Sequence, residues 1–316
     1  MMAAAPKVFI LILHWQKYEV TRNCLASFRT LEYSHYQIIV LDNASTNDSA
    51  HRLEKEFPEC LFIFNKENKG YGAGMNPGIR YALDHGGAYI FLLNNDVIVN
   101  QPEFLQLLLQ FMESHPQVGI AGPKLLFADG SYQRSYRYGF LSLALGFWSI
   151  EKIRTLWGRM QKKTDQGSIT HRVDWLNAVA LLFKRQVFED IGLMDERFFL
   201  GAEDVDLSLR ARQKEWETWY CAKSELTHLS FTSHDNAGSA GYDRFWVEST
   251  LLFLQKYYTF PVVLFVRMAM VLGLFLRGIQ WFFLGLFNRK YFKRAKTFFT
   301  ISCYTIISRP KFANKI

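Results

Sequence analysis

Apolar runs of strand length alternate with segments of helical spacing through the first hundred residues of this 316-residue chain. Two of these segments, EVTRNCLASFRTL and SAHRLEKEF, have the spacing of amphipathic helices. Such an order predicts an α/β fold with a Rossmann-like, mostly parallel sheet and crossover helices. The apolar runs expected to form its strands are Val8–Leu13, Gln37–Leu41, Cys60–Phe64 and Ala88–Leu93.

Polar side chains follow each of these runs. The carboxyl ends of parallel strands open onto the crevice where α/β sheets bind their ligands, so we expect these side chains to share one site. Asp42 is placed to accept a hydrogen bond from a nucleobase N–H or a ribose hydroxyl. The polar residues that end the runs are His14, Asp42, Asn43, Asn65, Asn94, Asn95 and Asp96.

Asp96 is a lone carboxylate among amides, directly after a run expected to be buried. This setting suits Mg²⁺ or Mn²⁺ that keeps several waters and takes its remaining ligands from substrate phosphates. The alternative is a turn residue that begins the loop to Pro102.

The glycine-rich segment NKGYGAGMNPGIRYA follows the third run. Its glycines allow a close backbone approach to a ligand, and we expect Asn76 to Gly78 to precede a helix whose N-terminal amides meet an anion. No Gly-Lys-Ser/Thr follows, so the segment is not a P-loop. A glycine-rich turn without a ligand remains an equal alternative.

The segment GAEDVDLSLRAR predicts a helix with Glu203, Asp204 and Asp206 in its first turn. The helix dipole favours acids there, but three carboxylates in four residues repel one another. We therefore expect either a cationic partner or a raised pKa, and a raised pKa suits a general base. We expect Arg210 and Arg212 to pair with this cluster, and His228 to contact a metal or a phosphate unless its role is structural.

Residues 101–174 look less regular, whereas ETWYCAKSELTH at residues 217–228 predicts a strand. A proline interrupts the helical pattern between Lys256 and Pro261. We therefore expect two domains, at residues 1–258 and 259–316.

The basic excess lies entirely in the C-terminal part. From Ser249 to Ile316 there are 11 Lys and Arg and no acid, which leaves 37 − 11 = 26 basic against 29 acidic residues before it, a net charge of −3. No uncharged run exceeds 13 residues, whereas a spanning helix needs about 20. The basic, aromatic-rich tail thus predicts amphipathic helices lying on an anionic membrane surface. The alternative is a helical pair packed on the body with a solvated basic face.

The setting expected for this chain is the cytoplasmic face of the inner (plasma) membrane, with peripheral or monotopic attachment. The opening MMAAAPKVFILILHW lacks the basic segment of a secretory signal. The cysteines, Cys24, Cys60, Cys221 and Cys303, have no metal or redox spacing, which agrees with a reducing compartment. The tail permits nucleic-acid binding, but no recognised module supports it, so we expect no nucleic-acid partner. The aromatic segment YRYGFLSLALGFWSI, residues 136–150, is a second candidate for contact with lipid or acceptor.

The motifs together resemble glycosyltransferase family 2, whose members have the GT-A fold. The resemblance covers residues 7 to 258 and rests on Asp42, GYGAGMNPG, LNND, EDVDLSLR and ELTH in that order. Within that family the sequence is similar to the bacterial rhamnosyltransferase-like members, because it has LNND in place of Asp-x-Asp. Asn94 therefore stands in the first acidic position of that motif, and Glu215 stands where a glycine is usual.

The resemblance implies a role for each site residue. Asp42 would bind the nucleobase, Asp96 the divalent metal on the diphosphate, and His228 the metal or a phosphate. Asp204, paired with Glu203, would be the general base. The remaining contacts to the nucleotide sugar would come from His14, Asn43, Gly70, Gly74, Asn76, Asn94 and Asn95.

The expected function is inverting, metal-dependent transfer of a sugar to a hydroxyl of a polyprenyl-diphosphate-linked glycan, in bacterial cell-surface polysaccharide synthesis. By the same resemblance the first expected donor is dTDP-rhamnose and the second a UDP-sugar. Other interpretations are a UDP-hexose transferase with another acceptor, a nucleotidyltransferase on a similar sheet, and a non-catalytic membrane-associated protein that binds nucleotide sugars.

Overall fold

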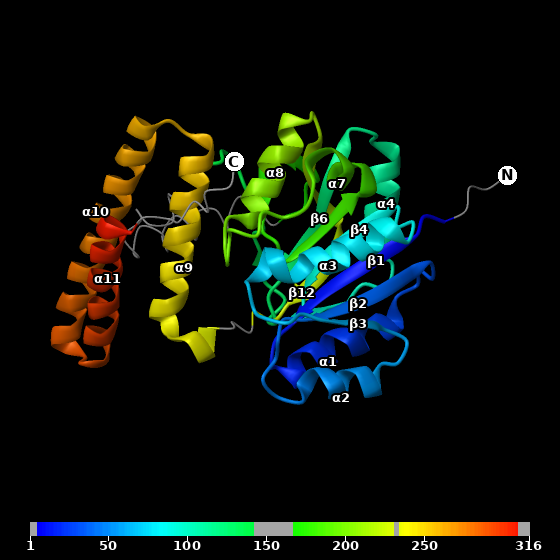
Figure 1. The fold of residues 1–316 in the computed structure, drawn as a ribbon, viewed down its shortest axis with the longest axis horizontal. Coiled ribbons are helices and arrows are strands. Elements are labelled where there is room, and N and C mark those ends of the chain that lie inside the picture. Colours follow the sequence, from blue (N-terminus) through cyan, green and yellow to red (C-terminus); the bar gives the residue numbers. More distant parts are fainter. Residues whose placement is uncertain (1–4, 142–166, 231–233, 309–316) are drawn as a thin grey trace. The chain divides into compact units, whose positions relative to one another are not determined.

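The computed structural model describes residues 5–141, 167–230 and 234–308, with the backbone alone described for residues 234–243. The chain forms two compact units (Figure 1). The first comprises residues 1–140, 167–199 and 203–231, and the second comprises the remainder. Most of the aromatic segment 136–150 lies outside the described residues.

A sheet of ten described strands forms the centre of the first unit, in the order β3-β2-β1-β4-β11-β6-β12-β5, with β7 beside β6 and β9 beside β12. The first four strands of this order are parallel, β6 and β12 are also parallel, and β11 is antiparallel to both of its neighbours. The strands are β1 (Val8–His14), β2 (Tyr36–Asp42), β3 (Leu61–Phe64), β4 (Tyr89–Asn94), β5 (Val97–Ile98), β6 (Val118–Leu126), β7 (Tyr132–Gln133), β8 (Tyr136–Arg137), β9 (His171–Val173), β10 (Trp175–Leu176), β11 (Ala180–Lys184) and β12 (Glu217–His228). Strands β8 and β10 form a separate ribbon.

Helices cover both faces of this sheet, because successive side chains of a strand point to opposite faces. Val8, Ile10 and Ile12 of β1 pack into a core with α1, α2 and α4, whereas Phe9 and Leu11 pack into a second core with α3, α7 and α8. Figure 1 shows α1 and α2 on one side of the strands and α3 across the other. The helices are α1 (Tyr18–Ser27, followed by a 3₁₀ turn at Phe28–Thr30), α2 (Ser49–Glu56), α3 (Tyr71–Asp84), α4 (Phe104–Ser114), α7 (Arg185–Ile191) and α8 (Glu203–Gln213).

The predicted α/β fold and its four N-terminal strands are confirmed, each strand within one or two residues of its expected bounds. The expected strand at residues 217–228 is β12, with the same bounds. The prediction of an irregular middle section was wrong for its first part, because residues 104–126 form α4 and β6. Strand β6 is buried on both faces and contains Gly119, Gly122 and Pro123, which weaken the local strand signal. Tertiary pairing with β11 and β12 decides its structure.

The glycine-rich segment also differs from the prediction. Helix α3 begins at Tyr71, so Asn76 and Gly78 lie inside it rather than before it. A Cβ atom at Gly74 would lie 2.8 Å from Leu13 Cδ1. A side chain there would displace the ends of the Leu13 and Asn43 side chains, so the glycine favours close packing of this helix on the sheet.

Glu215 adopts a left-handed backbone conformation, with φ of 66°. It follows α8, in the turn that leads into β12. Glycine adopts this conformation without the steric cost that a Cβ atom brings. A glycine therefore suits this position, and Glu215, which stands where a glycine is usual, occupies it with local backbone strain.

Three helices form the described part of the second unit: α9 (His234–Tyr257), α10 (Phe260–Phe287) and α11 (Lys290–Ile307). Val247, Leu251 and Leu254 of α9 share a core with α10 and α11. The helix break between Tyr257 and Phe260 lies where the proline predicted it, with Pro261 in the first turn of α10. Helix α10 is long and apolar enough to cross a membrane, judged by length and composition alone. The division of function between residues 1–258 and 259–316 stays a prediction.

Candidate active site

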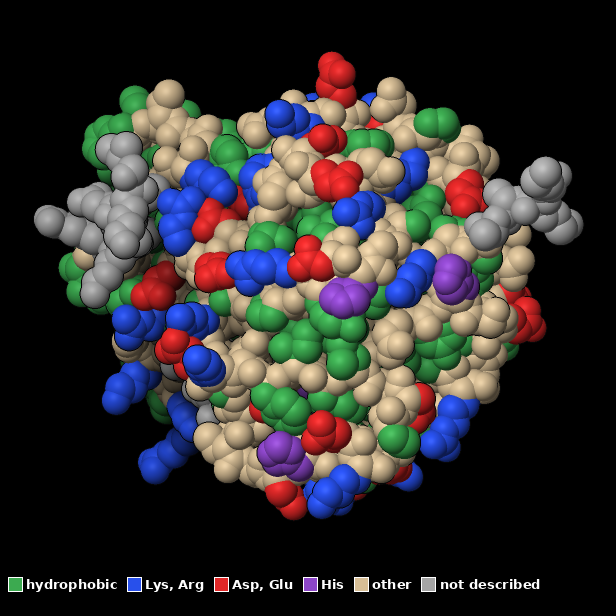
Figure 2. All heavy atoms as spheres, turned by 45° about the vertical axis from the view of Figure 1, so that its right-hand side comes forward, with side chains coloured by type: hydrophobic (Ala, Val, Ile, Leu, Met, Phe, Trp, Pro, Cys, Tyr) green, Lys and Arg blue, Asp and Glu red, His purple; other side chains and the backbone are tan. Residues whose placement is uncertain are grey.

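The carboxyl ends of β1, β2 and β4 lie side by side. In the parallel register His14 is opposite Asp42, and Leu13 is opposite Asn94. The prediction that the polar ends of the apolar runs share one edge of the sheet is therefore confirmed for these strands. On the face seen in Figure 2, acidic and basic side chains are interspersed rather than gathered into one charged field.

Backbone strain gathers at this edge. Gln16, Ala44 and Ser230 have positive φ values of 61°, 58° and 53°, and each lies two residues after the end of β1, β2 or β12. Residues other than glycine rarely adopt this conformation, and such residues cluster at functional sites. The strained turns thus mark the same edge as the polar side chains.

His14 is completely buried and joins the end of β1 to two helices. Its Nδ1 lies 2.7 Å from Thr21 Oγ1, and its Nε2 lies 2.8 Å from Ser49 Oγ. Burial lowers the pKa of His14 to about 4, against a smaller opposing effect of the Asp42 charge. The ring is therefore neutral at pH 7 and acts through the elements it positions, so ligand contact by His14 stays a prediction.

Asp42 and Asn43 are buried in the turn after β2. The carboxylate of Asp42 accepts a hydrogen bond from Ser45 N–H at 3.1 Å, which leaves further acceptor capacity. The Asn43 amide donates to Asn68 Oδ1 at 3.0 Å and to Gly70 O at 3.3 Å. These bonds hold the turn against the loop that precedes α3.

Gly70 and Asn76 meet the polypeptide far along the chain. Gly70 has φ of 96°, and a Cβ atom there would lie 2.1 Å from Phe199 O. The buried Asn76 amide donates to Met194 O at 3.0 Å and accepts from Met194 N–H at 3.0 Å. These contacts bring residues 194–199, which lead to α8, against the sheet edge. They also give both residues a packing role, and direct contact of either with a nucleotide stays a prediction.

Asp96 and His228 lie together, as the predicted metal pair requires. Asp96 Oδ1 lies 3.2 Å from His228 Nε2, and both side chains are almost fully buried. In the described part of the chain Asp96 Oδ1 has no hydrogen-bond partner. Strands β12 and β5 explain the proximity, since His228 pairs with Val97, the residue after Asp96.

Gln133 is a site residue that the sequence analysis missed. Its Oε1 lies 2.9 Å from His228 Nδ1. A protonated ring would form an ion pair with Asp96, whereas a neutral ring that donates from Nδ1 to the Gln133 amide oxygen leaves its Nε2 lone pair facing Asp96 Oδ1. Two facing acceptors fit a shared cation. No local motif announces Gln133, because 95 residues separate it from His228.

This pair is small for a metal site. Within the described residues, no group of three or more His, Cys, Asp or Glu side chains is placed to hold an ion. Two protein ligands suit Mg²⁺ or Mn²⁺ that takes its other ligands from water and phosphate, as the lone Asp96 predicted. Asn95 lies beside the pair, and its amide donates to Thr21 Oγ1 at 2.9 Å.

Asp204 lies in the first turn of α8, as predicted. Its Oδ2 accepts from Ala178 N–H at 3.0 Å, and its Oδ1 accepts from Val205 N–H at 2.8 Å. Burial raises the pKa of Asp204 to about 6, although these N–H groups and the positive charge of Arg137 oppose the shift. The predicted rise in pKa is confirmed, with burial rather than repulsion among the acids as its main cause.

The other acids of this turn have different surroundings. Glu203 is buried beside Asp204, and Asp206 is completely buried. Arg210 Nε donates to Asp206 Oδ2 at 2.8 Å, which confirms the pairing predicted for Arg210. The pairing predicted for Arg212 was wrong, because its guanidinium donates to Asp174 Oδ1 at 2.7 Å. Asp206 is thus a structural ion pair within α8, and Asp204 is the acid of this turn with a strongly raised pKa.

The two acids on which the predicted site depends, Asp96 and Asp204, share one neighbourhood. Burial, followed by the charges of Glu203, Asp204 and Asp96, raises the pKa of Tyr71 well above its usual value. The Tyr71 hydroxyl donates to Ala178 O at 3.2 Å, and Ala178 N–H donates to Asp204. The next residue, Val179, accepts from Asn94 N–H at 2.9 Å. One short segment before β11 therefore connects both acids.

Arg137, at the end of β8, adds a positive charge to this neighbourhood. Its guanidinium donates to Tyr136 O at 2.8 Å. Burial, and then the charge of Arg134, lowers the pKa of Arg137. The site therefore combines a poised carboxyl, a candidate cation pair and a half-buried guanidinium, a set suited to proton removal beside an anionic group.

Comparisons with known proteins agree with this geometry. The sequence pattern described as Glycosyl transferase family 2 matches residues 9–192. The N-acetylglucosaminyl-diphospho-decaprenol L-rhamnosyltransferase of Mycobacterium tuberculosis is 27% identical over 219 residues, which cover 65% of this chain and 70% of that protein. The dTDP-rhamnosyl transferase RfbF of Shigella flexneri is 24% identical over 192 residues, 60% of this chain and 58% of that protein.

A solved structure with the same fold is that of the mannosyltransferase PcManGT from Pyrobaculum calidifontis, in complex with GDP-Man and Mn²⁺. The TM-score is 0.58 at 13% identity, over 96% of this chain and 86% of that chain. At this identity the likeness concerns the fold, and it confirms the expected GT-A architecture. The family pattern spans more than half of the chain and includes the strand ends that carry Asp42 and Asp96. The chain belongs to glycosyltransferase family 2, and its sequence is similar to those of the rhamnosyltransferases named above.

Proposed function

We propose that this glycosyltransferase moves a sugar from a nucleoside-diphosphate sugar to a hydroxyl group of a polyprenyl-diphosphate-linked glycan, with inversion of configuration. The single observation that carries the proposal is the neighbourhood around Tyr71. There Asp204, whose pKa is about 6, lies near Asp96, whose buried oxygen faces His228 Nε2. A proton acceptor and a site for a diphosphate-bound cation are what this displacement needs.

The nucleotide end of the donor would lie at the ends of β1 and β2. Asp42 would accept from the nucleobase or the ribose, with its turn held by Asn43 and Ser45. The remaining proposed contacts come from the neighbouring loops, and some of them act by shaping the cradle rather than by touching the ligand: His14, Gly70, Gly74, Asn76, Asn94 and Asn95.

Asp96 and His228 would hold the divalent ion. Mg²⁺ or Mn²⁺ bound there would neutralise the charge that develops on the departing diphosphate. Gln133 supports this role, because it keeps His228 Nε2 free to ligate. The nearby Arg137 provides a fixed positive charge from the protein itself.

Asp204 would act as the general base. As its carboxylate takes the proton of the acceptor hydroxyl, the hydroxyl oxygen forms a bond to the anomeric carbon. The bond between that carbon and the diphosphate oxygen breaks, and the nucleoside diphosphate leaves with the electron pair. A single displacement inverts the configuration and needs no covalent intermediate. A pKa near 6 keeps Asp204 ionised at pH 7 yet more basic than an ordinary aspartate.

The relatives support the choice of substrates. One is named for transfer of L-rhamnose to N-acetylglucosaminyl-diphospho-decaprenol, and another as a dTDP-rhamnosyl transferase. We therefore propose dTDP-rhamnose as the first donor and a UDP-sugar as the second, with an acceptor anchored in the membrane. A lipid-linked acceptor would place the reaction at the cytoplasmic face of the plasma membrane, with the basic second unit on anionic lipid.

The test is incubation of the full-length protein with Mg²⁺, lipid-linked acceptor and a panel of dTDP, UDP and GDP sugars, while release of the nucleoside diphosphate is measured. We expect Asp204→Asn to lower the rate at least about 100-fold, because general-base catalysis contributes that much or more. The amide oxygen of asparagine still accepts from Ala178 N–H, so nucleotide binding should persist. Unchanged turnover in this variant would refute the role of Asp204, and absence of release with every donor would favour a non-catalytic binding protein.

A further inference from the structure

Helix α10 has an unusual distribution of side chains. Each of its exposed side chains is apolar, including Phe265 at 75% and Phe287 at 90% exposure. Its two cations, Arg267 and Arg277, are not exposed. At about 100° per residue the exposed set covers on the order of half the circumference of the helix. Its larger members are Phe260, Leu264, Phe265, Met268, Leu272, Phe275, Leu276, Phe282, Phe283, Leu284, Leu286 and Phe287, which we call the outer face of α10.

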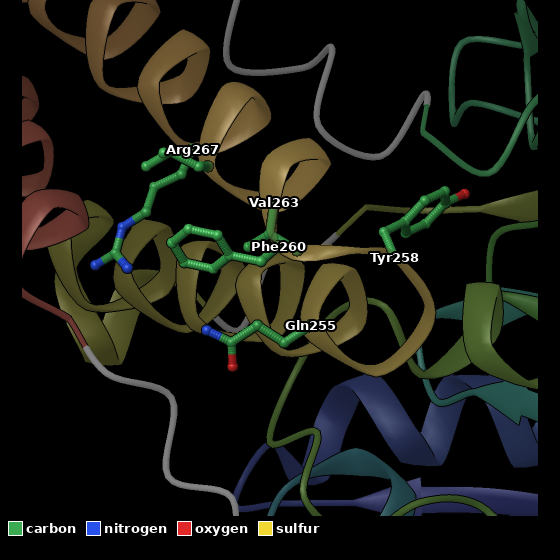
Figure 3. Close-up of a pocket in the computed structure, with 6 residues that line it drawn as sticks. Gln255, Tyr258, Phe260, Val263 and Arg267 are labelled. Carbon is green, nitrogen blue, oxygen red and sulfur yellow. The ribbon is translucent and has the colours of Figure 1, made fainter.

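Arg267 points toward α11. Its Nε donates to Thr305 O at 2.8 Å, and its Nη2 donates to Ile306 O at 2.8 Å and to Ser308 O. Figure 3 shows the side chain extending from α10 away from Val263. The carbonyls at a helix C-terminus have no partners within the helix, and they carry partial negative charge. Arg267 therefore caps α11, and its charge is satisfied without water.

Arg277 also lies on the side of α10 that faces α11, with its guanidinium 5.8 Å from the centre of the Phe298 ring. A helix at a protein surface in water normally puts its charged residues outward and its apolar residues inward. In α10 the order is reversed. A reversed order is stable where the surroundings of the outer face are themselves apolar.

Helix α11 accompanies α10 along its length. Cβ atoms at Gly278 and Gly285 would lie 2.6 Å from Phe299 and 2.7 Å from Phe292. Together with the capping by Arg267, these contacts pair both ends of the two helices. Exposed cations lie on α11 and in the preceding turn, at Arg289, Lys290, Lys293, Arg294 and Lys296.

The position of Arg277 argues against a transmembrane orientation. If α10 crossed the bilayer, Arg277, ten residues before the end of this 28-residue helix, would lie in the hydrocarbon, and a charged side chain there is costly. A position parallel to the surface avoids the cost, because long basic side chains reach the headgroups while apolar groups stay in the acyl region. The absence of any acid from Ser249 to Ile316 makes the hairpin complementary to anionic lipid.

We infer that the α10–α11 hairpin is embedded in one leaflet of an anionic membrane, parallel to its surface, with the outer face of α10 among the acyl chains. The inference rests on the membrane association in the proposed function and adds its depth and orientation. A hollow of about 270 Å³ supports it (Figure 3). Phe260 and Leu264 of the outer face line this hollow together with Val263 and Tyr258, and the polar side chains of Gln255 and Arg267 complete its wall.

The test uses the full chain with Cys60→Ser and Cys303→Ser, which leaves two buried cysteines. An environment-sensitive fluorophore is attached at Phe275→Cys on the outer face or at Asn288→Cys in the hairpin turn. The vesicles consist of phosphatidylcholine and phosphatidylglycerol, and they carry nitroxides on the acyl chains to quench a fluorophore that lies among these chains. Dithionite is added outside the vesicles to reduce a fluorophore that is exposed to water. We expect the Phe275 probe to be quenched by the nitroxides and protected from dithionite. The Asn288 probe should be reduced at the rate of a soluble probe.

Each other result overturns the inference in a distinct way. Protection of the Asn288 probe would show that the hairpin crosses the bilayer. Rapid reduction of the Phe275 probe, together with release of the protein by about 1 M salt, would show adsorption by charge alone. Protection of the Phe275 probe without vesicles, with a dimer in solution, would show that a second copy covers the outer face.

A matched pair of variants separates embedding from damage to the fold. Phe265→Ser with Phe283→Ser should weaken vesicle binding about tenfold or more, because each change removes a large apolar group from lipid. Phe64→Ser with Ile169→Ser changes exposed apolar residues of the first unit and should leave binding unaltered. If the two double variants bind equally, the outer face is not the contact. Failure of the unaltered protein to bind any vesicle would refute the membrane association itself, whereas sugar transfer to a detergent-solubilised acceptor would still test catalysis.

Discussion

Asp96 in the first unit is a buried charge and Arg267 in the second is a partly buried one, and their surroundings differ. In the described structure the Oδ1 atom of Asp96 accepts no hydrogen bond and faces a histidine nitrogen, whereas the guanidinium of Arg267 donates to three carbonyl oxygens. Buried polar atoms are nearly always satisfied. The guanidinium of Arg267 therefore holds the hairpin together, whereas the carboxylate of Asp96, in contact with His228, keeps acceptor capacity for a ligand.

The largest expected effect tests the unsatisfied side of this comparison. Gln133→Leu removes the nearer partner of His228 Nδ1 and leaves Ser230 Oγ at 3.3 Å, so the ring is held less firmly. Removal of such an outer-shell partner typically costs about 10- to 100-fold in metal affinity. We expect that loss in the dissociation constant for Mn²⁺, measured by electron paramagnetic resonance with nucleoside diphosphate present.

Two further variants control this measurement. Gln133→Glu keeps an oxygen acceptor and should retain most of the affinity, whereas Asp96→Asn should weaken binding at least as much as Gln133→Leu. If Gln133→Leu binds Mn²⁺ as tightly as the unaltered protein, Gln133 does not position His228.

The satisfied charge gives the next effect. Arg267→Met leaves the last carbonyls of α11 without their donor, and hydrogen bonds from charged groups contribute about 1.5 to 3 kcal/mol each. We expect the hairpin to lose about 2 kcal/mol of stability, seen as a lower midpoint of thermal unfolding in detergent by circular dichroism. Arg294→Met, at an exposed position over the Trp281 ring, should change the midpoint much less. Equal shifts in the two variants would contradict the capping role.

The pH dependence of transfer should report the poised carboxyl. Burial raises the pKa of Asp204 to about 6, so the base is ionised above this pH and protonated below it. We expect kcat to fall about tenfold for each pH unit below the pKa, since only the carboxylate accepts a proton. A rate that stays level down to pH 4.5 would exclude Asp204 as the base.

The same shift has a consequence for stability that can be measured separately. The folded state holds the Asp204 proton more tightly than the unfolded chain, so this contribution to stability is present at low pH and is lost as the pH rises through about 6. Asp204→Asn should therefore leave the fold at least as stable at pH 7.5, while transfer is lost.

The smallest effect concerns strain outside the site. Glu215 is exposed and left-handed, so Glu215→Gly relieves a steric cost at the price of a more flexible unfolded chain. We expect a net gain of about 0.5 to 1 kcal/mol in the free energy of unfolding, from denaturant titration, with activity unchanged. Ser230→Gly relieves strain at a residue next to the candidate site, so we expect this variant to change both the free energy of unfolding and kcat. A change in kcat in this variant alone would distinguish strain at the site from strain elsewhere.

Much of the first unit could be predicted from the sequence because its signals are local. The four N-terminal strands, β12 and the acidic start of α8 follow from periodicity and from residues adjacent in the chain. Strand β6 was missed because its glycines and proline hide a strand that long-range pairing stabilises. The start of α3 was misplaced because Gly74 looked like a ligand loop, whereas its missing side chain makes room for Leu13.

By itself the sequence determined which polar groups stand at the strand ends and which family the motifs resemble. The tertiary structure decided which of those groups remain free to act. His14 and Asn76 are engaged by partners within the fold, whereas Asp96 faces His228. The tertiary structure also directs Arg267 toward α11, so no charged side chain lies on the outer face of α10. The physical reason is that a polar atom's satisfaction depends on partners far along the chain, and only folding brings those partners within hydrogen-bonding distance.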